Sequence, residues 1–121
     1  MTFSPTPLPA GIAPEMLRTV FQPIFRLSTT EVLGYEALLR GPAGSAMESP
    51  AALFAAASDT AGTIALETTA ARLAIANFSA MRLPGKLFLN FSAQGVRQLL
   101  QDHARPVSYT HLRAHETGRN L

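Results

Sequence analysis

Two short apolar runs near the start of the chain predict a β-hairpin. The runs cover residues 19–27 and 32–40, and the polar residues 28–31 between them have a composition that favours a turn. Pro23 has no backbone N–H, which places the first strand at a sheet edge or at a bulge. Alternation along the second strand puts four residues on one face: Gly34, Glu36, Leu38 and Arg40.

The middle of the chain has the pattern of two helices. Ser49 and Pro50 are typical of an N-cap followed by proline at the first helical position, and they predict a helix over residues 51–58. Residues 59–62 interrupt the pattern. Residues 64–81 then carry apolar side chains at helical spacing on two sides, which predicts a long and largely buried helix.

A third strand and a further helix follow. Residues 86–92 contain a near-continuous apolar run, as expected for a parallel strand buried on both faces. Residues 93–101 return to helical spacing. A strand, helices and a second strand make a βαβ unit with parallel strands, so the chain is expected to be an α/β protein.

Composition narrows the classes of protein to which the chain can belong. The chain has 121 residues, of which 47% are hydrophobic, enough for one small domain with a core. The absence of cysteine excludes disulfides and thiolate metal sites. Ten basic against eight acidic residues give a formal charge of +2 without a basic cluster, so no binding of DNA or RNA is expected.

The expected cellular location follows from two features that the sequence lacks, a membrane span and a secretory signal. No run reaches the ~18 apolar residues that a membrane span needs, so no membrane segment is expected. Residues 1–17 are rich in proline and small residues, have no pattern of a secretory signal, and are interpreted as a flexible lead-in. A cytoplasmic location is therefore expected.

Three polar residues on these strands are candidates for binding chemistry. Glu36 and Arg40 lie about 13 Å apart along one strand face, too far for a direct salt bridge but suited to the two ends of a charged ligand. Asn90 lies near the carboxyl end of a buried strand, where polar groups of barrel enzymes usually serve chemistry. Each has an ordinary alternative: a strand glutamate paired with a neighbouring arginine, and an asparagine that ends a strand.

Three sequence blocks resemble the EAL domain family: Gln22-Pro23-Ile24, Gly34-Tyr35-Glu36-Ala37-Leu38-Leu39-Arg40 and Asn90-Phe91-Ser92. The resemblance implies a TIM-like (β/α)8 barrel with an antiparallel first strand. It also implies metal-dependent hydrolysis of cyclic di-GMP to linear pGpG. Such a barrel needs roughly 250 residues. Residues 18–106 are therefore expected to form a partial EAL domain, truncated after about three strands.

The resemblance also implies roles for single residues. Glu36 and Asn90 would be ligands of a two-metal site that holds Mg²⁺ or Mn²⁺. Arg40 would bind a phosphate, and Gln22 and Leu38 would help to seat the guanine-phosphate part. Gln22 has its own alternative, a polar residue satisfied by the backbone at a strand end.

The family's other acidic ligands and its catalytic lysine have no counterpart in this sequence, so no phosphodiesterase activity is expected of the chain as written. A non-catalytic domain that binds cyclic di-GMP or a partner protein is the alternative, and an unrelated small α/β domain is a third. For a full-length parent of this family, a homodimer with sensory or cyclase domains is expected.

The last segment, residues 107–121, does not continue the family pattern. Its sequence Val-Ser-Tyr-Thr-His-Leu-Arg-Ala-His-Glu-Thr is similar to a translated sequencing adapter, so the segment is interpreted as a non-native tail with neither the expected helix nor the expected strand. A rival interpretation is a metal site from His111 and His115, four positions apart on a helix. It lacks a third protein ligand.

Overall fold

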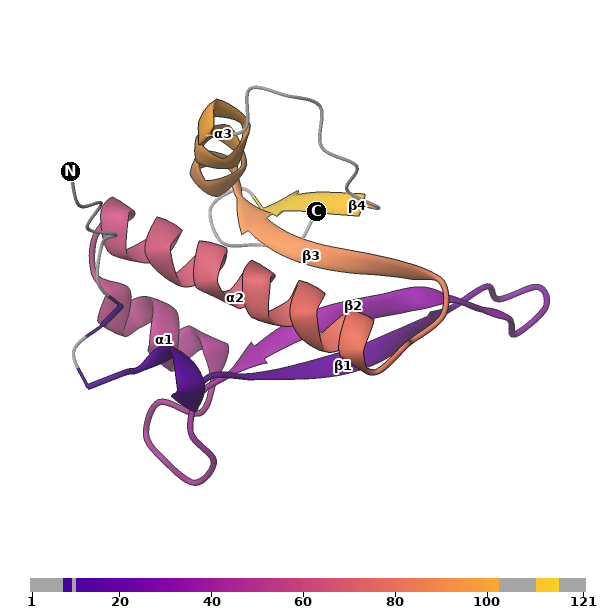
Figure 1. Cartoon of the computed structure of the whole chain (residues 1–121), viewed down its shortest axis with the longest axis horizontal. Helices are drawn as coiled ribbons and strands as arrows, with labels where there is room; N and C mark the ends of the chain where they lie inside the picture. The colour runs from indigo at the N-terminus through magenta and orange to yellow at the C-terminus, as the bar shows by residue number, and fades with distance from the viewer. Residues whose placement is uncertain (1–7, 10, 103–110, 116–121) are drawn as a thin grey trace.

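The computed structural model describes residues 8–9, 11–102 and 111–115, which form a mixed α/β arrangement (Figure 1). The long helix α2 lies along one face of the sheet, with α1 beside its first turns and α3 beyond the end of β3. The elements in chain order are η1 (Pro14–Met16), β1 (Arg18–Phe25), β2 (Val32–Arg40), α1 (Pro50–Ala57), α2 (Thr60–Ala80), β3 (Lys86–Ser92), α3 (Ala93–Asp102) and β4 (His111–His115).

The sheet has the order β1-β2-β3-β4. β1 is antiparallel to β2, whereas β2 with β3 and β3 with β4 are parallel. The predicted α/β class and the antiparallel first strand are therefore confirmed. β1 lies at an edge of the sheet, as the missing N–H of Pro23 predicts.

The hairpin register determines which side chains share a face. Gln22 lies directly opposite Glu36, and residues directly opposite in an antiparallel pair point to the same side. The register shifts between Ile24 and Phe25, where the strand ends. The prediction that this strand reaches residue 27 is wrong, because the Arg26 carbonyl oxygen already accepts turn hydrogen bonds from the Thr29 N–H (3.3 Å) and the Thr30 N–H (2.7 Å).

Helix α2 covers the face of the sheet that looks away from Glu36. Its Phe78 ring lies 5.9 Å from the ring of Phe21 and 6.3 Å from that of Tyr35. The main core cluster lies on this same side of the sheet. Its buried members are Ala37, Ala74, Leu87, Leu89 and Phe91.

Helix α1 packs against α2 in a second hydrophobic cluster, near the carboxyl end of β2. Leu53 of α1 and Leu66 of α2 are fully buried there, and Leu17 is 4% exposed. Leu8 and Ile12 pack against this cluster, so the described end of the lead-in segment contacts the core. Ser49 is the N-cap of α1 as predicted, because its Oγ accepts a hydrogen bond from the Ala52 N–H at 3.1 Å.

Helix α2 starts earlier than the sequence pattern predicts. The break expected at residues 59–62 is an N-cap followed by the first helical turn. Asp59 Oδ1 accepts a hydrogen bond of 2.7 Å from the Gly62 N–H, which satisfies one of the free donors of the helix start. The helix therefore begins at Thr60 rather than at residue 64.

The end of the described chain adds a fourth strand. Residues 111–115 form β4, which pairs with residues 88–92 of β3. The sequence predicts no strand with a second acidic ligand in this segment, and β4 carries no acidic residue. The rival prediction of a helical His111–His115 pair is wrong. On a strand these two positions lie about 13 Å apart, too far to share one ion. Residues 107–110 and 116–121 lie outside the described part of the chain.

Candidate functional site

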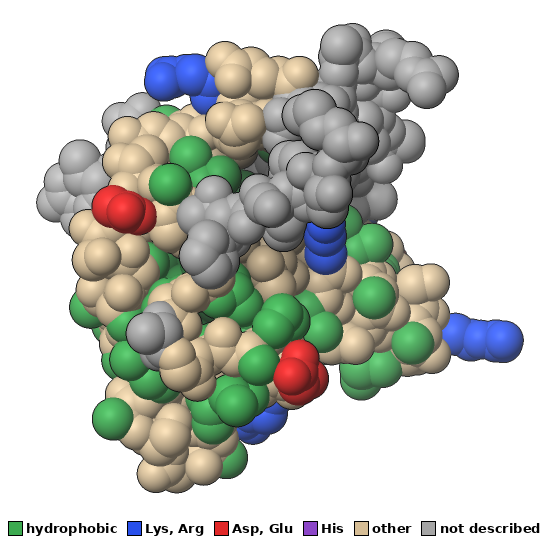
Figure 2. Space-filling model, turned by 60° about the vertical axis from the view of Figure 1, so that its left-hand side comes forward, with side chains coloured by type: hydrophobic (Ala, Val, Ile, Leu, Met, Phe, Trp, Pro, Cys, Tyr) green, Lys and Arg blue, Asp and Glu red, His purple; other side chains and the backbone are tan. Residues whose placement is uncertain are grey.

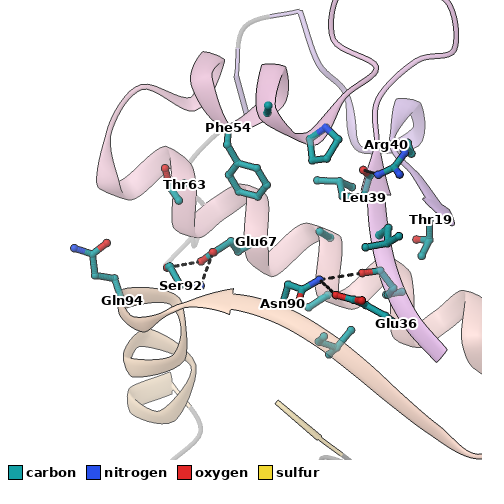
Figure 3. Close-up of a pocket in the computed structure, with 18 of the residues that line it drawn as sticks. Thr19, Glu36, Leu39, Arg40, Phe54, Thr63, Glu67, Asn90, Ser92 and Gln94 are labelled. Atoms are coloured by element: carbon teal, nitrogen blue, oxygen red, sulfur yellow. Dashed lines mark hydrogen bonds between the residues drawn. The ribbon is translucent and has the colours of Figure 1, made fainter. Parts of the chain in front are cut away.

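Strands β2 and β3 diverge toward their carboxyl ends and leave a cleft between them. Their backbone pairing covers Gly34–Glu36 on β2 and Lys86–Phe88 on β3, although β2 continues to Arg40 and β3 to Ser92. The cleft has a volume of about 1070 Å³ (Figure 3). This volume is at the upper end of the range of small-molecule binding sites.

Small side chains on α2 leave room for this cleft. Ala70, Ala71 and Ala74 line its floor, and Phe54 of α1 forms part of one wall. The five residues for which the sequence predicts ligand contacts all line the cleft: Gln22, Glu36, Leu38, Arg40 and Asn90. Gln94 and Arg97 of α3, which the sequence did not single out, line it as well.

Glu36 and Asn90 contact each other in the cleft, although 54 residues separate them in sequence. Asn90 Nδ2 donates a hydrogen bond of 2.9 Å to Glu36 Oε2 and lies 3.4 Å from the carbonyl oxygen of Ala37 (Figure 3). Both side chains are half-buried. The two side chains therefore lie together on one side of the sheet, and their role as metal ligands stays a prediction.

The other predicted residues lie around this pair. Gln22 is exposed opposite Glu36, and Leu38 lies on the same face two residues further along β2. Arg40 lies at the end of β2, where its Nη1 donates to the Leu39 carbonyl oxygen at 2.8 Å. Among the described residues, an ion pair of 3.3 Å joins Arg18 to Glu48, and no ion pair joins Glu36 to Arg40.

A second carboxylate in the cleft was missed by sequence reasoning. Glu67 of α2 is 7% exposed, and its two oxygens accept hydrogen bonds from the Ser92 N–H (2.7 Å) and the Ser92 Oγ (2.8 Å). The sequence signal was present, since a helix that is apolar on two sides carries this one acid among its inward positions. A buried acid requires hydrogen-bond partners, but the pattern does not identify them.

The described residues fit one oxygen-bound ion better than two. Carboxylate and amide oxygens are suitable ligands for Mg²⁺ or Mn²⁺. Glu36 carries a carboxylate and Asn90 an amide, whose nitrogen rather than oxygen faces Glu36 in this structure. Mg²⁺ commonly takes one or two protein ligands and completes its shell with water and phosphate oxygens. Within the described ranges, no group of three or more His, Asp or Glu side chains is placed to hold a metal ion.

Basic side chains are spread over the described surface. On the face shown in Figure 2, Lys and Arg side chains lie apart from one another among apolar and uncharged groups. Among the helices of the described residues, none has the length and apolar character to cross a bilayer.

Comparison of the chain with protein-family models, with curated proteins and with solved structures gave no match. The resemblance to the EAL domain family therefore rests on its three sequence blocks.

Proposed function

We propose that this chain carries the first part of an EAL-type domain and that its cleft binds cyclic di-GMP. In this proposal the sheet is the start of a TIM-like barrel, with β1 antiparallel and β2 and β3 as the first parallel strands. Three sequence blocks support it, together with the strand order and the presence of all five expected residues around one cleft. The parent domain would hydrolyse cyclic di-GMP to linear pGpG.

The contact between Glu36 and Asn90 is the observation that carries the proposal. The two residues come from different sequence blocks, and a chance resemblance gives no reason for them to meet. The contact itself is a hydrogen bond of 2.9 Å from the Asn90 amide nitrogen to Glu36 Oε2. An ion at this place would be held by the Glu36 carboxylate and, with the amide turned over, by Asn90 Oδ1. A bound Mg²⁺ or Mn²⁺ would supply positive charge for a phosphate of the dinucleotide.

The remaining residues have roles that suit a phosphodiester ligand. The Arg40 guanidinium can bind a phosphate through two N–H groups. The side chain of Gln22 offers a donor and an acceptor to a base edge, and Leu38 provides apolar contact beside it. The exposed Gln22 lies on the same sheet face as Glu36, so a ligand on this face can contact both.

Binding without cleavage is the second candidate, and the ligand inventory favours it for the chain itself. Hydrolysis by two metals needs ligands that hold the two ions about 4 Å apart and an activated water. Glu36 and Asn90 provide two ligands in the described residues. A metal-assisted dinucleotide receptor needs no more than these together with Arg40.

Equilibrium dialysis with labelled cyclic di-GMP tests the proposal, with and without Mn²⁺, on the 121-residue chain. We expect Mn²⁺ to strengthen binding and Glu36→Ala to remove the effect of Mn²⁺. Glu48→Ala is the matched control, because Glu48 is an exposed glutamate that does not line the cleft. The proposal is wrong if the folded wild-type chain does not bind the dinucleotide, or if Glu36→Ala responds to Mn²⁺ as the wild type does.

A further inference from the structure

The buried Glu67 makes a set of contacts that the proposed function does not use. Its carboxylate accepts two hydrogen bonds from Ser92, one from the backbone N–H and one from the hydroxyl (Figure 3). Ser92 is the last residue of β3, and α3 begins at the next residue. One side chain of α2 therefore holds the junction between a strand and a helix.

Ser92 also acts as the N-cap of α3. Its Oγ accepts a hydrogen bond of 3.0 Å from the Gly95 N–H while its hydroxyl hydrogen points to Glu67. A negative carboxylate at this position is favourable, because the N-terminus of a helix carries a partial positive charge. The Glu67 side chain thus lies beside the start of α3 and contacts its cap.

The close packing at Gly95 leaves little freedom for this carboxylate. A Cβ atom added at Gly95 would collide with Glu67 Oε1 and come within 3.2 Å of the Phe91 ring. The absence of a side chain at residue 95 is what lets Glu67 reach Ser92. The carboxylate is therefore held between the first turn of α3 and the end of β3.

The carboxyl half of β3 pairs with β4 on one side, and beyond Phe88 its backbone has left the ladder with β2 on the other. On that side, hydrogen bonds from the side chain of Asn90 reach Glu36 and Ala37 of β2. Two residues later, Ser92 is bound to Glu67 of α2. A displacement of Ser92 would move Asn90, because only one residue separates them along the strand.

We propose that Glu67 is a positioning residue that sets the place of Asn90 in the cleft by holding Ser92 and the start of α3. The link to ligand binding rests on the proposed function, since it assumes that Asn90 contacts the bound ion. The link to the structure of the cleft does not depend on any ligand.

The side-chain amide of Asn90 gives a direct readout of this placement. In ¹H–¹⁵N spectra of the 121-residue chain, its signals are identified as those lost in Asn90→Asp. We expect its amide protons to exchange with solvent about tenfold faster in Glu67→Ala and Ser92→Ala, the effect of losing about one buried hydrogen bond. We expect Glu67→Gln to restore part of the protection, because its amide can still accept from the Ser92 N–H.

Thr63→Ala is the matched control, since Thr63 lines the cleft one helical turn before Glu67. It should leave the exchange of the Asn90 amide unchanged. The proposal is wrong if folded Glu67→Ala and Ser92→Ala show wild-type exchange at Asn90. If Glu67→Ala does not fold, Ser92→Ala decides, because that change removes the half-buried hydroxyl with its bonds to Glu67 and Gly95 and keeps the backbone N–H that donates to Glu67. If both variants unfold, the proposal is wrong, because the contact between Glu67 and Ser92 then stabilises the whole fold and does not specifically position Asn90.

Titration of the same samples with cyclic di-GMP and Mn²⁺ separates this proposal from the proposed function. If the wild type binds, Glu67→Ala and Ser92→Ala should weaken binding about tenfold, in step with the amide exchange. If the wild type does not bind, the proposed function fails, and the Asn90 exchange still decides the role of Glu67.

Discussion

The side-chain amide of Asn90 bridges β2 and β3 where their backbones no longer pair, with Nδ2 2.9 Å from Glu36 Oε2 and 3.4 Å from the Ala37 carbonyl oxygen. The same residue thus closes a gap in the sheet and lines a cleft. A polar side chain in this position has a structural role even before any ligand binds.

Asn90→Ala tests this structural role. We expect the free energy of unfolding to fall by about 1 kcal/mol, because the half-buried Glu36 carboxylate loses a hydrogen-bond donor. Urea unfolding followed by circular dichroism measures the change. Gln94→Ala is the control, since Gln94 is an exposed cleft residue, and it should change stability by less than about 0.5 kcal/mol. Equal stabilities of the two variants would contradict the prediction.

The isolated chain should bind cyclic di-GMP without hydrolysing it. In the proposed function Glu36 and Asn90 are the metal ligands among the described residues, whereas the two-metal reaction needs ligands for two ions and an activated water. Incubation with cyclic di-GMP and Mg²⁺ or Mn²⁺, followed by chromatographic detection of linear pGpG, measures turnover. Product formed by the chain in proportion to its concentration would refute the prediction.

Removal of the N-cap of α1 should destabilise the fold. Ser49→Ala loses the hydrogen bond from the Ala52 N–H, and we expect a loss of about 1 kcal/mol in the free energy of unfolding. Thermal or urea unfolding measures it. Ser79→Ala is a matched control on the exposed last turn of α2, where alanine is a good helix former and should cost less than about 0.5 kcal/mol. A similar loss in both variants would argue against the cap.

Gly34 is required by the close approach of two strands. A Cβ atom at this position would collide with the backbone of Lys86, which cannot rotate away, so we expect Gly34→Ala to lower the free energy of unfolding by about 2 kcal/mol or more. Gly44→Ala provides the comparison. Gly44 has φ of +77° but open space around it, so only the backbone cost of about 1 kcal/mol applies. The prediction fails if urea unfolding shows that Gly44→Ala lowers the free energy of unfolding more than Gly34→Ala does.

Short-range sequence patterns were sufficient to predict many of the helices and strands of this fold. The strand pattern of residues 32–40 and the apolar run of residues 86–92 predict β2 and β3 with their observed bounds. In β3 the buried residues Leu87, Leu89 and Phe91 share one face. Ser49-Pro50 predicts the start of α1 through its cap chemistry. The start of α2 was harder to predict. Gly62 resembles a helix breaker, yet it lies in the first turn of the helix, where its N–H donates to Asp59.

The candidate site was only partly predictable for a related reason. Strand alternation places Glu36, Leu38 and Arg40 on one face, but it contains no information on the divergence of β2 from β3. The role of Glu67 depends on Ser92, which lies 25 residues away in sequence and meets it only after α2 packs on the sheet. Contacts of this kind arise from tertiary packing and have no periodic signature.

The proline in the edge strand affects how the molecule meets other copies of itself. The outer side of β1 presents backbone groups to which a strand from another chain could add, and exposed edges of this kind promote aggregation. Pro23 lies near the middle of that edge and offers no N–H, so a strand added along β1 finds no backbone donor at this position. One residue thus weakens self-assembly along this edge of the described sheet.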